Sequence, residues 1–262
     1  MNTDLSGRRA IVCGSTQGIG RACAQELAEL GASVTLVARN EDKLKAVRDA
    51  LPTPQQQEHH YLAADFQQPD FLKAKISDYV SNQSAVGILV NNTGGPAAGP
   101  AYEAEVDAFR RAFEMHVFCN QILVQAVVPL MRQGGYGRII NIISTSVKEP
   151  IPGLGVSNTT RGAVANWAKT LSGELGPDGI TVNNVLPGST DTDRIWDLVR
   201  KRAAAQDKSE AEVEQAMMAA IPLRRFAQPE EIAYAVAFLA SPAAAYINGV
   251  NLTVDGGKMG CG

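Results

Sequence analysis

The sequence predicts an α/β protein of a single domain, residues 1–262, with a doubly wound parallel sheet of about seven strands and helices on both faces. Short runs rich in Val and Ile alternate with longer amphipathic segments, which is the pattern of repeated βαβ units. The runs are apolar at successive positions, as expected of strands that are covered on both faces. Hydrophobic residues make up 45% and charged residues 19%, so a chain of this length can bury a sizeable core.

The expected elements follow one another along the chain in this alternation. The strongest candidate strands cover residues 9–13, 33–38, 87–91, 138–143 and 181–186, and weaker ones lie near residues 61–64 and 250–254. The helical segments between them include residues 19–30, 41–51, 103–131 and 156–175. Neighbouring strands that run parallel need a crossover connection, which is usually a helix of this kind. Residues 193–221 are polar, rich in Ala and helical without a strand partner, so we expect an insertion that covers the substrate site.

Charge and cysteine usage exclude several classes of protein. The net charge is −3 and no dense run of Lys and Arg occurs, so we expect no nucleic-acid partner. The cysteines Cys13, Cys23, Cys119 and Cys261 are scattered, which predicts neither a metal centre nor a disulfide scaffold and fits a reducing cytoplasm. Residues 1–13 lack the apolar core of a signal peptide, and the most apolar stretch, residues 232–240, is too short to span a bilayer. We therefore expect a cytoplasmic protein without a membrane partner.

A glycine-rich loop lies between the first strand and the first helix, in the order Cys13-Gly-Ser-Thr-Gln-Gly-Ile-Gly20. Glycines allow a tight turn and the close approach of a pyrophosphate, whose charge a helix N-terminus stabilises. A glycine-rich loop alone also fits a plain β–α turn, but here the required strand, helix and second strand are all present. We expect dinucleotide contacts from Gly14, Ser15, Thr16, Gly18, Ile19 and Gly20.

The end of the second strand predicts which dinucleotide is bound. An acidic residue there would bind the ribose hydroxyls of NAD(H), but the sequence has Ala38-Arg39-Asn40. The planar guanidinium of Arg39 suits the 2′-phosphate of NADP(H), and hydroxyls of Ser15 and Thr16 could add donors. The prediction is NADP(H), with Asn40 beside it, while NAD(H) stays open because Arg39 also fits a solvated helix start.

These motifs together resemble the short-chain dehydrogenase/reductase family. The glycine spacing resembles its T-G-x-x-x-G-x-G pattern, with Cys13 in place of Thr. Asn91-Asn92-Thr93-Gly94 resembles its N-N-A-G, and Pro187-Gly188 with Thr192 resembles its P-G-x-x-x-T. Residues 248–257 resemble its C-terminal strand, and the resemblance extends to the 3-oxoacyl-[acyl-carrier-protein] reductases without implying an acyl substrate.

The resemblance implies a Rossmann-type fold and an oxidoreductase acting on a small-molecule substrate. It implies a homodimer or homotetramer formed through the helices at residues 103–131 and 156–175. It also implies an adenine contact for Asp65 and a contact of Thr192 with the nicotinamide carboxamide. The remaining cofactor contacts that it implies are Asn92, Thr93, Gly94, Pro187 and Gly188.

The catalytic residues of the family are only partly present. The family uses a Ser, an Asn and a Tyr-x-x-x-Lys pair, in which the Lys lowers the pKa of the Tyr and binds the nicotinamide ribose. Ser144 matches the Ser, but Ser157 stands at the Tyr position and Arg161 at the Lys position, and His116 stands at the Asn position. No Tyr occurs between residues 136 and 234, so a shifted alignment does not restore it.

These replacements keep polarity but change the proton chemistry. A Ser hydroxyl is a much weaker acid than a phenol and normally needs a separate base. Arg161 stays positively charged and could still hold the ribose, as the Lys does in the family. The nucleotide-binding part of the pattern is therefore retained, whereas the usual proton-transfer pair is replaced.

Three functions stay open at this point. The first is an NADP(H)-dependent oxidoreductase for a carbonyl or secondary alcohol, with Ser144, Ser157, Arg161 and His116 as catalytic candidates. The second is a nucleotide-binding protein without redox activity. The third is a lyase or hydrolase that uses His116, Lys148 or Glu149 as acid or base, since an imidazole has an unperturbed pKa of about 6.5. His116 also fits a packing histidine, and Lys148 and Glu149 fit a solvated loop pair.

Overall fold

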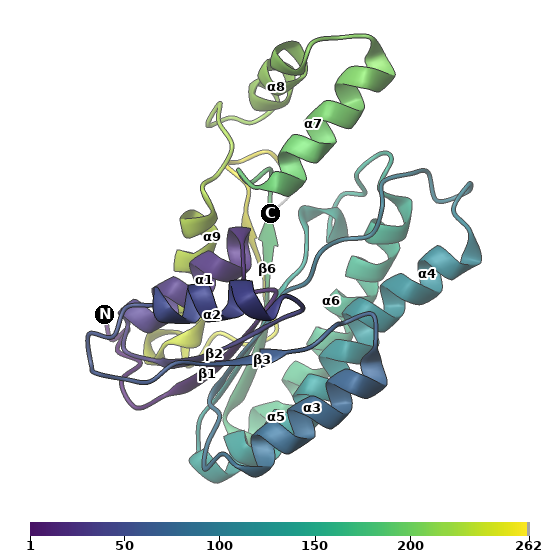
Figure 1. Cartoon of the computed structure of the whole chain (residues 1–262). Coiled ribbons are helices and arrows are strands. Elements are labelled where there is room, and N and C mark those ends of the chain that lie inside the picture. Colours follow the sequence, from purple (N-terminus) through teal and green to yellow (C-terminus); the bar gives the residue numbers. More distant parts are fainter. Residues whose placement is uncertain (261–262) are drawn as a thin grey trace.

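The computed structural model describes residues 1–260, and one seven-stranded sheet between two layers of helices dominates it (Figure 1). The strand order is β3-β2-β1-β4-β5-β6-β7, and every neighbouring pair is parallel. The strands are β1 (Arg9–Cys13), β2 (Ser33–Ala38), β3 (His60–Ala63), β4 (Ile88–Asn91), β5 (Gly137–Ile142), β6 (Ile180–Pro187) and β7 (Asn251–Val254). The predicted fold class is confirmed, and each predicted strand agrees to within one residue at either end.

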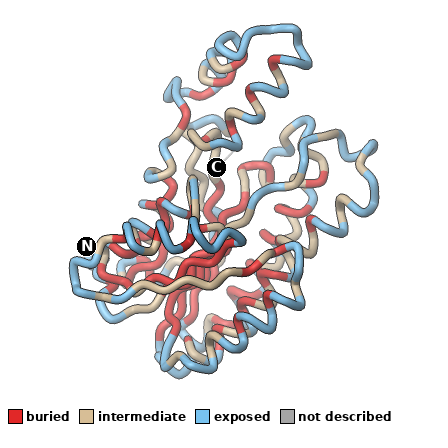
Figure 2. Tube along the Cα trace, in the orientation of Figure 1, coloured by how far each residue is buried: buried red, intermediate tan, exposed pale blue. Residues whose placement is uncertain are grey.

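Helices cover both faces of the sheet and enclose two separate cores. One face carries α1 (Gly18–Glu29), α2 (Glu41–Asp49) and α9 (Pro229–Ala240). The other face carries α3 (Pro69–Ser81), α5 (Cys119–Gly134) and α6 (Gly155–Leu175). Burial is concentrated in the strands and in the helix sides that face them (Figure 2). Burying the strands on both faces explains why they are apolar at successive positions.

A π-helical turn interrupts the longest helical stretch. We expect one helix over residues 103–131, but the structure has α4 (Val106–Phe113), the π-helical turn η1 (Glu114–Phe118) and then α5. Within residues 1–260, Val106–Gly134 is the one stretch long and apolar enough to cross a membrane by length and composition. Its residues Leu123, Val127 and Met131 are fully buried in the core beneath the sheet, so its apolar character serves packing.

Four asparagines form a hydrogen-bonded row across half of the sheet. Asn91 Nδ2 donates to Asn141 Oδ1 (2.8 Å), Asn141 Nδ2 donates to Asn184 Oδ1 (2.9 Å), and Asn184 Nδ2 donates to Asn251 Oδ1 (2.8 Å). The parallel register places each of these residues opposite the next. Because a slip of one residue would turn each side chain to the other face, this row fixes the alignment of β4 to β7.

Residues beyond the carboxyl end of β6 form a separate helical projection, which we call the α7–α8 unit. It consists of α7 (Asp193–Gln206) and α8 (Glu210–Ala219) and stands away from the sheet (Figure 1). A small core that includes Val199, Val213 and Met217 holds the two helices together. The predicted insertion at residues 193–221 is thus helical, and its role as a substrate lid stays a prediction.

Replacing Asn141 with Leu is expected to lower the free energy of unfolding by about 3 kcal/mol, because a buried amide donor and a buried carbonyl lose their partners. Asn251→Ala is the matched control, since it breaks a bond of the same row at an exposed position and should cost less than about 1 kcal/mol. Urea unfolding followed by circular dichroism measures both. Equal losses in the two variants would contradict the buried row as a stabilising element.

Candidate functional site

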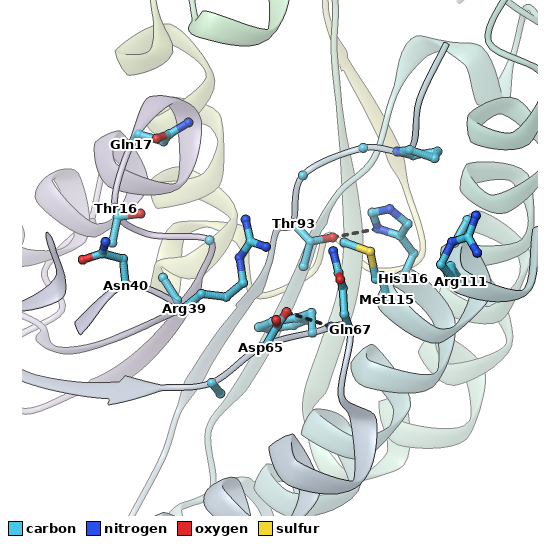
Figure 3. A pocket seen from close by; sticks show the side chains of 18 of the residues that line it. Thr16, Gln17, Arg39, Asn40, Asp65, Gln67, Thr93, Arg111, Met115 and His116 are labelled. Carbon is cyan, nitrogen blue, oxygen red and sulfur yellow. Dashed lines mark hydrogen bonds between the residues drawn. The ribbon is translucent and has the colours of Figure 1, made fainter. Parts of the chain in front are cut away.

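A cavity of about 690 Å³ opens at the carboxyl edge of the sheet. It lies where β1 and β4 are neighbours and the strand order reverses, which is the usual ligand position in doubly wound sheets. The volume suits a small molecule or cofactor. The predicted site residues that line the cavity are Gly14, Thr16, Arg39, Asn40, Asp65, Thr93, Gly94 and His116 (Figure 3).

The glycine loop leaves no space for side chains at two positions. Gly14 has φ +58°, and a Cβ there would lie 2.6 Å from the Asn92 carbonyl oxygen. A Cβ on Gly20 would lie 2.2 Å from the Gly14 carbonyl oxygen. Asn92 Nδ2 donates to the carbonyls of Cys13 (3.2 Å) and Gly14 (3.3 Å), which ties the loop to the end of β4. The first N–H groups of α1 receive no side-chain cap, so they are available to an anion.

Cations dominate the part of the cavity at the end of β2. Arg39 and Lys43 both line it, and neither has an ion pair with a carboxylate of the described chain. Asn40 Oδ1 accepts the backbone N–H of Lys43 (2.8 Å) and caps α2. Asp65 lies across from Arg39 and accepts the backbone N–H of Gln67 (3.0 Å) (Figure 3). This arrangement fits a bound phosphate better than an unmodified ribose.

The hydroxyl of Ser15 points away from the cavity, and a cofactor contact of this residue stays a prediction. Its side chain is fully buried and its hydroxyl donates to the Val37 carbonyl (3.4 Å) in β2, so it does not line the cavity. The backbone turn at Gly14 directs this hydroxyl to the strand, and Thr16 is the hydroxyl residue of the loop that lines the cavity.

The remaining predicted cofactor contacts are not among the residues that line the cavity, and their role stays a prediction. The methyl carbon of Thr192 lies 3.1 Å from the point where a Cβ on Gly18 would be, so the loop after β6 reaches the glycine loop. Gly188 donates its N–H to the Val254 carbonyl (2.9 Å), which anchors that loop to β7. The others in this group are Ile19, Gly20, Asn92, Pro187 and Arg161.

His116 lies in the π-helical turn η1 and is buried, with only 2% of its surface exposed. Its Nδ1 and the Thr93 hydroxyl oxygen are 2.7 Å apart (Figure 3). Its Nε2 has no hydrogen-bond partner in the described part of the chain. Burial, with a smaller effect from the charge of Arg161, lowers the pKa of His116 from 6.5 to about 2. The imidazole is therefore neutral at physiological pH, in contrast to the expected group that titrates near neutrality.

Arg161 occupies α6 one helical turn after Ser157. Its guanidinium is buried and Nη1 donates to the Ile142 carbonyl (3.0 Å) at the end of β5. Burial, and after it the charge of Arg194, lowers the pKa of Arg161 to about 10, so the group stays charged near neutral pH. Ser144 follows β5, is half-buried and accepts the backbone N–H of Ser146 (3.1 Å). Ser144, Ser157 and Arg161 remain catalytic predictions.

Lys148 and Glu149 follow the short turn η2 (Thr145–Val147), half-buried and exposed respectively, and their proposed acid–base role stays a prediction. The structure brings to the site several residues that were not predicted from the sequence. Lys43 lies in the first turn of α2, four residues after Arg39, and its closeness in the sequence to Arg39 was a usable signal. The other missed residues, with no such signal, are Gln67, Arg111, Met115 and Arg194.

Comparison with known proteins agrees with this geometry. The family model described as enoyl-(acyl carrier protein) reductase matches residues 14–258. The chain belongs to the short-chain dehydrogenase/reductase family. This confirms the predicted family and assigns the chain to a family of NAD(P)-dependent oxidoreductases.

Individual relatives cover nearly the whole chain. The 3-oxoacyl-[acyl-carrier-protein] reductase FabG of Rickettsia prowazekii (strain Madrid E) is 34% identical over 256 residues, 98% of each chain. The NADPH-dependent reductase BacG of Bacillus subtilis (strain 168) is 30% identical over 256 residues, 97% of this chain and 99% of BacG. The crystal structure of L-sorbose reductase from Gluconobacter frateurii, complexed with NADPH and L-sorbose, gives a TM-score of 0.92 at 30% identity and covers 100% of both chains.

Replacing His116 with Asn is expected to flatten the loss of stability in acid. The folded chain keeps His116 neutral to a pKa of about 2, whereas the unfolded chain binds a proton near 6.5. The free energy of unfolding therefore falls as the pH falls below about 6.5, by at most about 1.4 kcal/mol per pH unit from this group.

Urea unfolding of the wild type and His116→Asn between about pH 7 and about pH 4.5 measures this slope. His60→Asn is the control, because burial lowers the pKa of His60 too, but that side chain is only half-buried and should change the slope less. Parallel stability curves for the wild type and His116→Asn would contradict the buried neutral imidazole.

Proposed function

We propose that the chain is an NADP(H)-dependent oxidoreductase that interconverts a carbonyl group and a secondary alcohol of a small molecule. The observation that carries this proposal is Arg39, which lines the cavity without an ion pair in the described chain and lies beside the glycine loop. Two relatives whose names state NADPH, BacG and L-sorbose reductase, support the choice of cofactor.

The residues of the site fit such a cofactor. The loop from Gly14 to Gly20 and the N-terminus of α1 would hold the pyrophosphate, because the backbone there admits no Cβ. Arg39, with Thr16 and Lys43, would hold the 2′-phosphate. In this assignment Asp65 contacts the adenine and Thr192 the carboxamide of the nicotinamide, as the family resemblance implies.

The bound cofactor supplies or accepts the hydride, and the protein provides the site for the substrate oxygen. Ser144 and Ser157 are assigned to donate hydrogen bonds to that oxygen. The fixed charge of Arg161 stabilises the negative charge that develops there, as preorganised donors do in other enzymes. Arg161 keeps its proton and His116 is neutral, so the proton reaches the oxygen through the Ser hydroxyls and water.

One observation favours a second candidate, a nucleotide-binding protein without redox activity. Ser157 stands where the family has the phenol that transfers the proton. The imidazole of His116 is not protonated at neutral pH, so it does not supply a proton in place of that phenol. This candidate predicts tight NADPH binding without oxidation of NADPH by any carbonyl compound. A substrate screen that follows nicotinamide absorbance separates the two candidates.

Replacing Arg39 with Ala is expected to weaken NADPH binding about ten- to hundredfold, because the 2′-phosphate loses a charge-assisted contact. NADH binding should change by less than about twofold, because NADH lacks that phosphate. Fluorescence titration of the purified protein with each nucleotide measures both affinities.

The matched control is Arg48→Ala, since Arg48 also belongs to this region but pairs with Asp49 and does not line the cavity. Its NADPH affinity should equal that of the wild type. A preference of the wild type for NADH, or an equal loss of both nucleotides in Arg39→Ala, would contradict the assignment.

A further inference from the structure

Two guanidinium groups converge beside Gly95, in the loop that follows β4. A Cβ built on Gly95 would lie 3.6 Å from Arg194 Nη2 and 3.9 Å from Arg161 Nη2. Both nitrogens thus lie within 4 Å of one point, and they are separated by less than about 8 Å. The two residues come from different elements, since Arg161 is in α6 and Arg194 is in the first turn of α7. The fold therefore brings two like charges together at this point.

Backbone carbonyls hold both side chains in place. Arg161 Nη1 donates to the Ile142 carbonyl (3.0 Å) at the end of β5, and Arg194 Nη2 donates to the Pro96 carbonyl (2.8 Å). Each guanidinium has five N–H donors, so several donors of each group remain for another acceptor. The pair is preorganised by the protein and does not depend on a bound molecule for its position.

No carboxylate in residues 1–260 compensates these charges by an ion pair. Arg161 is only 8% exposed, whereas Arg194 lies at the surface end of the pair. A buried cation without a partner is unfavourable, and a second cation nearby adds repulsion. The lowered pKa of Arg161 has these two causes, burial first and Arg194 second. An anion between the two guanidinium groups would pair with the buried cation and offset the repulsion between the two charges.

The imidazole of His116 is a further buried polar group close enough to Arg161 to be affected by its charge. Its Nε2 is buried and unpartnered among the described residues, and the charge of Arg161 reaches it. When Nδ1 accepts the hydroxyl proton of Thr93, Nε2 carries the ring proton and is a donor. In that tautomer the imidazole N–H adds a third donor to the two guanidinium groups.

This donor cluster adjoins the proposed reaction site. Gly94, the residue before Gly95, lines the cavity, Ser157 precedes Arg161 by one turn of α6, and Arg194 follows Thr192 by two residues. Planar guanidinium forks match the oxygens of a carboxylate or a phosphate. We infer that the substrate carries an oxyanion, a carboxylate or a phosphate, near its carbonyl group, and that Arg161 and Arg194 bind this oxyanion. The inference rests on the proposed function, because it names the substrate class of the same site.

The test uses probes that need no turnover. Oxalate, inorganic phosphate and neutral oxamide are titrated by calorimetry into the protein saturated with NADPH, so that the phosphate sites of the cofactor are occupied. Oxalate or phosphate should bind and oxamide should not, and the tighter of the two anions identifies the oxyanion. Arg194→Gln should weaken that binding at least about tenfold.

Arg200→Gln is the matched control, because Arg200 lies on the same helix but is exposed and paired with Asp197. It should bind the anion as the wild type does. Binding of neither anion, equal binding of oxamide, or equal effects of the two variants would overturn the inference. NADPH affinity is measured in separate titrations of the same proteins, so a failure of the proposed function shows as lost NADPH binding. In that case oxalate is titrated without NADPH into the wild type and Arg194→Gln, and the difference between them still tests the donor cluster.

Discussion

The hydrogen bonds from Asn92 to the glycine loop are the constraint on which the site depends. The side chain bridges the end of β4 to the carbonyls of Cys13 and Gly14, at the point where the strand order reverses. The absence of space for a Cβ at Gly14 and Gly20 follows from this close approach. It also places Thr16 and Gln17, directly before α1, at the cavity, so that the uncapped N–H groups of the helix are available to an anion. Asn92 therefore acts on the cofactor site through the backbone that it holds.

The buried charge of Arg161 organises the other half of the site. Its guanidinium donates to the Ile142 carbonyl at the end of β5 and keeps a positive charge at neutral pH. The same charge, together with burial, keeps His116 neutral. In the proposed function, Arg161 and Ser157 stand where the family has Lys and Tyr, so that a fixed cation and hydroxyl donors would take the place of a titrating phenol. The same cation lies near Arg194, because both guanidinium groups lie within 4 Å of one point beside Gly95.

Most of the fold was predictable, because strands buried on both faces leave strong apolar runs between turn residues. The glycine loop and Arg39 were predictable from motif and spacing. The direction of the Ser15 hydroxyl could not be predicted, since the backbone turn at Gly14 decides which way it points. Arg194 could not be found, because its meeting with Arg161 depends on how the α7–α8 unit leaves β6. The neutral state of His116 depends on burial, which the residue type does not reveal.

The central claim is hydride transfer between NADP(H) and a carbonyl carbon, and isotope transfer tests it most directly. The protein is incubated with NADPH that carries deuterium at both C4 positions and with a panel of oxo acids and neutral carbonyl compounds, and the products are analysed by mass spectrometry. The account predicts an alcohol with one deuterium on the former carbonyl carbon, formed about a hundredfold more slowly by Ser144→Ala. Turnover that yields a product without deuterium would contradict the account.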